Sequence, residues 1–420
     1  MSTEADTAAS GRTRDARHSR FAVLRIRNFR LFVAGQLTSV TGTWMMVGAQ
    51  DWLVLELSGN SAVALALITV CQFGPALVVP IGAGVLADRF AKRTVLIVAN
   101  CSAAVLTAIQ TLVVVGGHIE LWHLYAIAAG IGVVAAVETP VRMAFITEIV
   151  GAERFRDASA LSAMYFGLAQ LCGPALSGVL IGTLGTGAAM GVNAVSYLAT
   201  VATLLRVRPG ELYRADRSPG RSDPLRGLRR VRGDLELRHT VLLVLLVGFF
   251  ALTLRVTTPL LARGELDSDP IEFGILAAAT AVGSLVAAVL AGARGTPSVR
   301  RAAVVAMILG GGEIALAPVT APWLAVLVLA VCGAMITLFL QTVNHHLQLG
   351  AGPGNRVHVI AVYTMIVQGI TPLAAIAVGV AAERYGVRAV VAAGGAATLG
   401  GACAILLRHR VLGARIAGNG

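Results

Sequence analysis

The sequence has few charged residues and almost no lysine. Only 13% of its 420 residues are Asp, Glu, Lys or Arg, against about 25% in soluble domains, which excludes an ordinary water-soluble domain. Lysine occurs once among the 34 basic residues, which suggests a GC-rich genome and says nothing about a ligand. The five cysteines all lie in apolar stretches and share no metal-like spacing, so no disulfide framework is expected.

The sequence also lacks the motifs of enzymes and nucleotide-driven proteins. No Gly-rich nucleotide-binding loop is followed by Lys, and no group of His, Cys, Asp and Glu has metal-ligand spacing. No Ser/His/Asp or Cys/His arrangement can be argued for nucleophilic catalysis. We therefore expect neither an enzyme nor an ATP-driven transporter, and we expect no cofactor and no metal.

Long apolar stretches make up most of the chain. Hydrophobic residues account for 56% of it, and the mean hydropathy is +0.77. A membrane core about 30 Å thick needs about 20 apolar residues in a helix. We expect an all-α membrane protein with twelve transmembrane helices, at residues 30–56, 61–87, 94–115, 121–141, 158–181, 187–206, 239–262, 272–293, 301–318, 322–345, 358–382 and 389–408.

The basic residues alternate between the two sides of this predicted topology. Thirty of the 34 Lys and Arg residues fall in every second gap between the apolar stretches. Short basic loops stay on the cytoplasmic side during insertion, and an even number of spans places both termini there. The sequence therefore predicts a multi-pass protein of the cytoplasmic (inner) membrane. The net charge of +12 raises the question of nucleic acid, but these residues flank apolar helices, so anionic lipid headgroups are the better partner.

A polar, Arg-rich segment with three prolines divides six spans from six. The expected organisation is a basic cytoplasmic tail, an N-terminal six-helix bundle, a cytoplasmic linker, a C-terminal six-helix bundle and a second cytoplasmic tail. These parts are assigned to residues 1–29, 30–206, 207–238, 239–409 and 410–420. We expect the chain to act as a monomer.

Prolines and charged residues stand at corresponding positions in the two halves, about 200 residues apart. The Gly-Pro pair at 173–174 corresponds to the Thr-Pro pair at 371–372, and Asp51 corresponds to Arg255. Pseudo-symmetric repeats are typical of transporters that move one bundle against the other around a central site. Neither a channel nor a membrane enzyme needs this symmetry.

The loop between the second and third spans carries a recognisable motif. Residues 84–96 read GVLADRFAKRTVL, which closely resembles the cytoplasmic loop signature of the major facilitator superfamily, G-x-L-a-D-R-x-G-R-K-x-x-L. The resemblance implies the fold of that superfamily, with two bundles of six helices. One position departs from the signature, because Ala91 stands where the family usually has Gly. Alanine tolerates positive φ poorly, so we expect this turn to be either α-like or slightly strained.

In that superfamily the acid and the bases of this loop form a charge latch that keeps the cytoplasmic side closed. The resemblance implies that Asp88 is the latch acid and that Arg89 and Arg93 are its basic members, with Gly84 and Lys92 completing the motif. An Arg–carboxylate contact strengthens when a closing interface excludes water. The alternative is an ordinary basic loop that only fixes the orientation of the chain.

Wider stretches are similar to one branch of the superfamily. RNFRLF at 27–32, WLVLELSG at 52–59, TPVR at 139–142 and GPALSG at 173–178 resemble bacterial exporters of the enterobactin-exporter-like and drug-efflux branch. The resemblance covers residues 25–408 and implies efflux.

The span at 158–181 contains a Gly-Pro element similar to a motif of proton-coupled exporters. Pro174 removes a backbone hydrogen bond and kinks a helix, while Gly173 and Gly178 allow close packing at the bend. Such a bend would seal one bundle against leaks. The alternative is a structural kink with no bearing on the direction of transport.

Asp51 and Arg255 are charged residues that lie inside predicted spans, at corresponding places in the two halves. Asp51 lies about five residues from the outer end of the first span, and Arg255 about seven from the outer end of the seventh, which places both roughly 8–10 Å below the helix end. We expect them to form an outer gate that pairs when the protein faces inward, with Asp51 carrying the coupling proton. The alternative is that both side chains reach the outer interface and are only hydrated.

Other polar residues in the spans are weaker site candidates. Gln50, Gln341 and Asn344 are candidates for the cavity wall. Glu138 and Arg142 stand four residues apart and are candidates for an inner gate, although a local ion pair at the helix end is the simpler interpretation.

These observations favour a secondary active transporter that exports a small amphipathic, drug-like or siderophore-like molecule in exchange for protons by alternating access. An importer or facilitator of a small polar solute has the same architecture and would need a more polar cavity. A non-transporting membrane receptor or assembly factor on this scaffold is the alternative of a different class, and loss of the latch motif would favour it.

Overall fold

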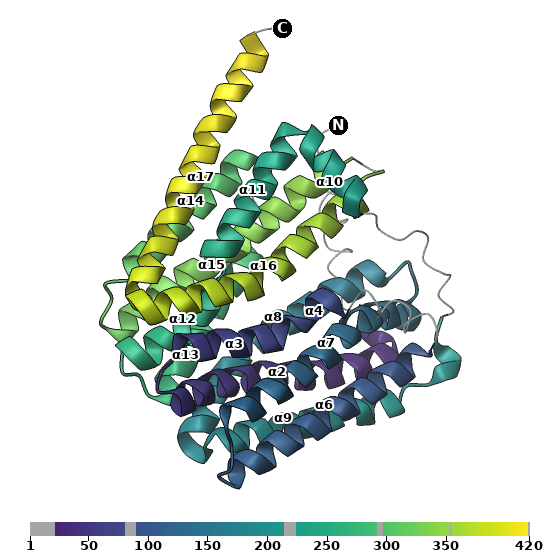
Figure 1. Ribbon diagram of the computed structural model, residues 1–420. Helices are drawn as coiled ribbons and strands as arrows, with labels where there is room; N and C mark the ends of the chain where they lie inside the picture. The colour runs from purple at the N-terminus through teal and green to yellow at the C-terminus, as the bar shows by residue number, and fades with distance from the viewer. Residues whose placement is uncertain (1–21, 80–89, 214–223, 292–296, 353, 419–420) are drawn as a thin grey trace, which may run out of the picture.

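The fold consists of helices packed in two groups, as the apolar stretches predict (Figure 1). The computed structural model describes residues 22–79, 90–213, 224–291, 297–352 and 354–418. All regular structure in these ranges is helical. Helices are the expected form because a chain in lipid must satisfy its backbone hydrogen bonds within each span.

The first half begins with a short 3₁₀ turn, η1 (Val23–Arg25), and ends after α9. Its helices are α2 (Arg27–Ser58), α3 (Ala62–Phe73), α4 (Pro75–Val78), α6 (Lys92–Val115), α7 (Leu121–Val150), α8 (Phe155–Leu184) and α9 (Thr186–Leu205).

The segment between the halves contains a 3₁₀ turn, η2 (Pro209–Glu211), and a short helix, α10 (Pro224–Gly233), that packs against α16 of the second half. The second half comprises α11 (Leu235–Phe250), α12 (Leu254–Leu260), the π-helical turn η3 (Leu261–Glu265), α13 (Pro270–Ala291), α14 (Val299–Leu316), α15 (Pro322–Gly350), α16 (Arg356–Tyr385) and α17 (Val387–Gly418).

Nine of the described helical segments are long and apolar enough to cross a membrane. The other three expected spans correspond to α2, to the shorter apolar stretch Ala62–Val78, and to α14. Helix α2 has 32 residues but buries polar side chains such as Gln36, Gln50 and Asp51. The helices are consistent with the expected twelve spans, and the all-α membrane fold is confirmed.

The seventh span is interrupted in a way that the first is not. It consists of α11, a turn at 251–253, α12 with Pro259 inside it, and η3. At the turn, the Leu252 amide donates to the Val247 carbonyl at 3.0 Å, five residues back rather than four. The first span, α2, is continuous.

The two halves meet at one end of the molecule and diverge toward the other (Figure 1). Helix α8 packs against α13, and α3 packs against α16; these pairs are equivalent under the expected repeat. We call the end where α2 begins the connector end, because residues 207–213 and 224–238 also lie there, and the end where α2 meets α3 the distal end. The halves are in contact at the distal end.

Several helices run further at the connector end than the expected spans. Helix α7 continues to Val150 and α15 to Gly350, and α17 runs through the expected tail to Gly418. Apolar length reports membrane thickness, whereas a helix continues into water wherever its own hydrogen bonds and packing support it. The tail expected at 410–420 is therefore a helical extension up to Gly418.

The expected conformation at Ala91 is wrong. Ala91 precedes α6 with φ −60° and ψ 123°, which is an extended conformation that alanine adopts without strain. The turn is neither α-like nor strained at this residue. Replacement of the usual Gly therefore has no conformational cost at this position.

Candidate functional site

The two charged residues inside the spans lie on opposite sides of the interface between the halves. Asp51 belongs to α2, and Arg255 belongs to α12. The Arg255 guanidinium carbon lies 4.2 Å from the centre of the Phe73 ring and 4.9 Å from that of the Trp44 ring. Both rings belong to the first half, so Arg255 reaches across the interface and is held there by cation–π contacts.

Asp51 is buried, and its carboxylate is incompletely satisfied. The side chain is 7% exposed, and within the described ranges its Oδ1 atom has no hydrogen-bond partner. Arg255 is the charged residue that acts on it electrostatically, but no ion pair within 4.0 Å joins the two side chains. The structure therefore brings the two predicted gate residues near each other without direct contact.

Gln50, the neighbour of Asp51, is occupied inside the first half. The Gln72 side chain donates to Gln50 Oε1 at 2.9 Å, and Gln50 Nε2 donates to Gln110 Oε1 at 3.0 Å. This chain of amides joins α3, α2 and α6. Gln50 is 2% exposed, so it stabilises the first half and does not line an open cavity.

The distal end is closed by a carboxylate that crosses between the halves. Glu383 near the end of α16 accepts hydrogen bonds at Oε2 from Ser61 Oγ at 3.2 Å and from the backbone amides of Ala62 and Val63 at 2.8 and 3.3 Å. These groups form the N-terminus of α3. A helix N-terminus has unsatisfied amides and a partial positive charge, so Glu383 caps a helix of the other half.

The predicted Gly-Pro element lies at the same interface. A Cβ atom on Gly178 would lie 2.5 Å from the Pro270 carbonyl oxygen and 2.8 Å from Gly274 Cα. Gly173 makes a similar close approach to Trp44 of α2, where a Cβ would lie 2.5 Å from the Trp44 Cβ. Helix α8, with Pro174 inside it, is therefore pressed against α2 on one side and α13 on the other.

Aromatic contacts complete the distal closure. The rings of Trp52 and Phe273 lie 5.4 Å apart, and the Arg263 guanidinium carbon lies 4.6 Å from the Trp52 ring centre. Trp52 belongs to the first half and the other two residues to the second. Together with Glu383, these contacts join the two halves at the distal end.

Only part of the loop motif lies within the residues that the structure describes. Gly84, Asp88 and Arg89 lie outside the described residues. Lys92 forms an ion pair with Glu148 of α7 at 2.6 Å. Arg93 donates to the carbonyls of Leu204 and Leu205 at 2.8 and 2.9 Å, where it satisfies the C-terminal end of α9. Both bases thus hold α6 against helices of their own half.

Glu138 and Arg142 do not form the expected local ion pair within the described part of α7. Arg142 lies inside the helix rather than in a loop, and it donates to Gln36 of α2 at 3.1 Å. Its guanidinium carbon lies 6.0 Å from the centre of the Phe166 ring. The long side chain reaches these partners because the connector-end parts of α2, α7 and α8 adjoin.

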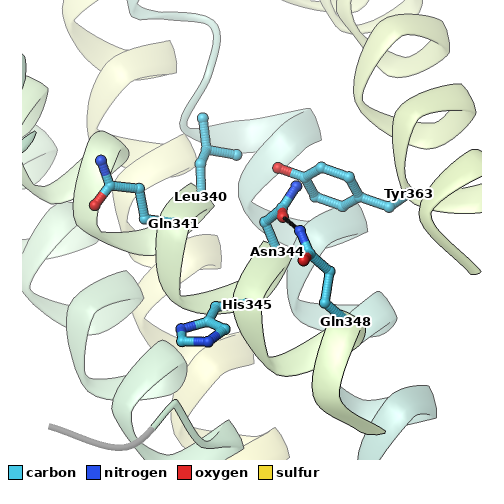
Figure 2. Close-up of a pocket in the computed structure, with 6 residues that line it drawn as sticks. All are labelled: Leu340, Gln341, Asn344, His345, Gln348 and Tyr363. Atoms are coloured by element: carbon cyan, nitrogen blue, oxygen red, sulfur yellow. Dashed lines mark hydrogen bonds between the residues drawn. The ribbon is translucent and has the colours of Figure 1, made fainter. Parts of the chain in front are cut away.

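A cavity of about 450 Å³ lies on α15 and α16 toward the connector end. Leu340, Gln341, Asn344, His345, Gln348 and Tyr363 line it (Figure 2). Gln348 donates to the Asn344 carbonyl oxygen, and the Tyr363 hydroxyl points toward Asn344 (Figure 2). The predicted pair Gln341 and Asn344 is therefore brought together in one cavity with a tyrosine from a neighbouring helix.

Three residues were not predicted from the sequence: Gln348 and Tyr363 of this cavity, and Glu383 of the distal contact between the halves. Gln348 stands seven residues after Gln341 and four after Asn344, a spacing that places all three on one helical face and that would have revealed it. Tyr363 and Glu383 carry no comparable signal, because their partners come from other helices.

Comparison with known families supports the fold assignment. The family model described as "Transmembrane secretion effector" matches residues 18–415. The staphyloferrin A transporter of Staphylococcus aureus (strain NCTC 8325 / PS 47) is 24% identical over 268 residues, which are 61% of this chain and 65% of that protein. The uncharacterized MFS-type transporter YfiS of Bacillus subtilis (strain 168) is 25% identical over 267 residues, 62% of this chain and 63% of that protein. The chain thus spans just under two thirds of the length of these relatives.

Solved structures share the architecture at low identity. A bacterial homologue of the human lysosomal transporter Spinster, in an inward-facing and occupied conformation, gives a TM-score of 0.71 at 14% identity over 92% of this chain and 97% of that one. The POT family transporter PepTSo gives 0.70 at 12% identity, over 92% of this chain and 98% of that one. These likenesses concern the fold alone. With the family match over nearly the whole chain, they show that this multi-pass membrane protein belongs to the transmembrane secretion effector family of major facilitator superfamily transporters.

Proposed function

We propose that this protein is a proton-coupled exporter of a small amphipathic molecule in the cytoplasmic membrane. The observation that carries the proposal is that the two halves are joined at the distal end through Glu383 and diverge toward the connector end, where the cavity of about 450 Å³ lies (Figure 1). Such a geometry presents the cavity to the compartment on the connector side. Substrate enters there and leaves after the distal contacts separate.

The connector side is assigned to the cytoplasm. The described residues there include Arg206, Arg208, Arg226, Arg229 and Arg230, and basic loops are retained on the cytoplasmic side. Both termini are then cytoplasmic, and the basic surface meets anionic headgroups of the inner leaflet. The loop motif, with Asp88 as its acid, closes this side in the opposite state. We propose that one chain suffices for transport, because both gates come from its two halves.

Cargo chemistry is inferred from the cavity wall. Gln341, Asn344, Gln348 and Tyr363 offer uncharged hydrogen-bonding groups, and Leu340 offers an apolar surface. Hydrogen-bonding groups beside an apolar side chain suit a molecule that is part polar and part hydrophobic. That a relative carries the name staphyloferrin A transporter supports siderophore-like cargo as one member of this class.

Asp51 is proposed as the proton-coupling group. Its buried carboxylate has one unpartnered oxygen and faces Arg255 of the other half without touching it. A charge in this position favours approach of the two halves, and a proton on Asp51 removes that attraction. The protonation state of a single residue thereby biases which end of the molecule is closed.

The test uses purified protein in liposomes, with a panel of fluorescent amphipathic substrates and imposed pH gradients. Wild type is expected to move substrate against its gradient, away from the connector side, only when protons flow in the reverse direction. Asp51→Asn should fold and bind substrate but lose dependence on the gradient. Full proton-driven transport by this variant would exclude Asp51 as the coupling group. Glu56→Gln, an exposed acid on the same helix, is the matched control and should behave as wild type.

A second candidate is an importer or facilitator of a small polar solute. It is favoured by the gathering of Gln341, Asn344, Gln348 and Tyr363 around one cavity, which is more polar than the sequence suggests. The same liposomes distinguish the two. An importer would accumulate polar solutes toward the connector side, and a facilitator would equilibrate them without a pH gradient.

A further inference from the structure

The second half contains another cavity, separate from the one on α15 and α16. It has a volume of about 470 Å³ and lies among α11, α12, α14, α16 and α17. Its wall is mostly apolar, with Phe249, Phe250, Leu254 and Val390 among its members. The one acidic residue of its lining is Glu313.

The position of Glu313 is fixed by close helix packing. Helix α14 approaches α17 so closely that a Cβ on Gly395 would lie 2.9 Å from the Glu313 Cβ and 2.6 Å from the Gly310 carbonyl oxygen. This packing fixes the Glu313 Cβ atom at the interface of α14 and α17, beside the cavity. Glu313 stands three residues before the end of α14, within the distal half of the span.

Glu313 is buried. It is 2% exposed, and its Oε2 atom has no hydrogen-bond partner among the residues that the structure describes. No ion pair to Glu313 occurs among the described side chains. The nearby hydroxyls of Thr253 and Thr257 are engaged with the carbonyls of Phe250 and Thr253 at 2.8 and 3.4 Å. A buried carboxylate without a counter-charge is costly, and a positive charge placed in this cavity would offset the cost.

The rim of this cavity is partly exposed. Ala377, Tyr385, Ala389 and Ala393 of its lining are exposed, and they belong to helices long and apolar enough to cross a membrane. These residues belong to the distal ends of α16 and α17. A ligand that partitions into the membrane can reach the opening from the bilayer.

We propose that this cavity is a binding site for hydrophobic monovalent cations, with Glu313 as the counter-charge and the aromatic and aliphatic wall as the contact for the apolar body. Its volume falls within the range of small-molecule sites. The proposal is independent of the transport cycle, because neither Asp51 nor the residues of the α15–α16 cavity contribute to this site.

The test measures binding of radiolabelled tetraphenylphosphonium to the purified full chain by equilibrium dialysis, with no pH gradient. Tetraphenylborate, of similar shape and opposite charge, is the matched probe. Wild type should bind the cation, and Glu313→Gln should bind it at least tenfold more weakly or lose one site per chain. The variant should bind tetraphenylborate no more weakly than wild type does.

Two further variants separate the site from folding and from the central cleft. Ala381→Leu fills the cavity from α16 while keeping the acid, and it should weaken cation binding even if Glu313→Gln does not fold. Asp51→Asn should leave binding at this site unchanged. Cation binding that is unaffected by both Glu313→Gln and Ala381→Leu overturns the proposal. In nanodiscs, competition by phosphatidylethanolamine but not phosphatidylglycerol would support the site and identify a lipid ammonium group as its source of cation.

Discussion

Removal of the Glu383 carboxylate is expected to loosen the distal closure. One oxygen of this side chain accepts hydrogen bonds from Ser61 Oγ and from the Ala62 and Val63 amides, at 2.8 to 3.3 Å. In Glu383→Ala all three donors lose their acceptor. In Glu383→Gln the carbonyl oxygen can still accept, but the negative charge at the helix N-terminus is lost.

The free energy lost in Glu383→Ala depends on how far the Glu383 side chain is exposed to solvent. Hydrogen bonds to a charged acceptor contribute about 1.5–3 kcal/mol when buried, and a charge at a helix N-terminus contributes about 0.3–1 kcal/mol. Glu383 is exposed, so solvent screening reduces both contributions. We expect a total loss of about 1 kcal/mol for Glu383→Ala, which corresponds to about a fivefold change in the equilibrium between closed and open distal ends.

Hydrogen–deuterium exchange measured by mass spectrometry reads this change directly. In Glu383→Ala, the peptide that contains Ala62 and Val63 should exchange about fivefold faster, and Glu383→Gln should be intermediate. Glu56→Gln is the control, because Glu56 is an exposed acid at the same end of the molecule. Equal exchange in wild type and Glu383→Ala, or equal acceleration in Glu56→Gln, would refute the assignment of Glu383 as an inter-half cap.

Two other substitutions test the interface. Gly178→Val places a side chain where a Cβ alone would lie 2.5 Å from the Pro270 carbonyl oxygen, so the substitution should hold the distal end open. Distances between spin labels on the two halves at that end should lengthen. Unchanged distances would contradict the close approach of α8 and α13. Arg255→Lys replaces a planar guanidinium that lies over Trp44 and Phe73 by a point charge and should weaken contact between the halves by about 1 kcal/mol. Amide exchange in α12 should then accelerate several-fold, and unaltered exchange would mean that the stacking contributes nothing measurable.

The order of the helices and their distal-end limits could be predicted because they depend on one physical quantity. Membrane thickness sets the length of each apolar stretch, and the expected starts at 121, 187 and 322 lie within two residues of the observed starts of helices α7, α9 and α15. The connector-end limits could not be predicted in the same way. Beyond the membrane, helix length depends on packing and backbone hydrogen bonds, which composition does not report.

Residues of the candidate site could be predicted where a charged residue interrupts an apolar stretch of sequence. Asp51 and Arg255 are visible as charges in apolar runs, and the structure brings them near each other. The contact partner of a charged side chain could not be predicted in the same way. Arg142 could bond Glu138 one turn away, but such pairs contribute only about 0.2–0.5 kcal/mol, and the chain folds with Gln36 of α2 within reach instead. The spacing of residues along one helix does not show which residues of other helices lie within reach.

The interrupted seventh span makes the two repeats mechanically unequal. At 251–253 and again at η3 the regular ladder of hydrogen bonds between residues four apart is replaced by other backbone hydrogen bonds, so we expect the span to bend at these points more readily than elsewhere. The unbroken α2 has no such joint, and we expect it to move as one rigid helix. In the proposed transport cycle, α11 could then tilt while α12 keeps its contact with the first half through Arg255, so the second half would change shape in two steps and the first half in one.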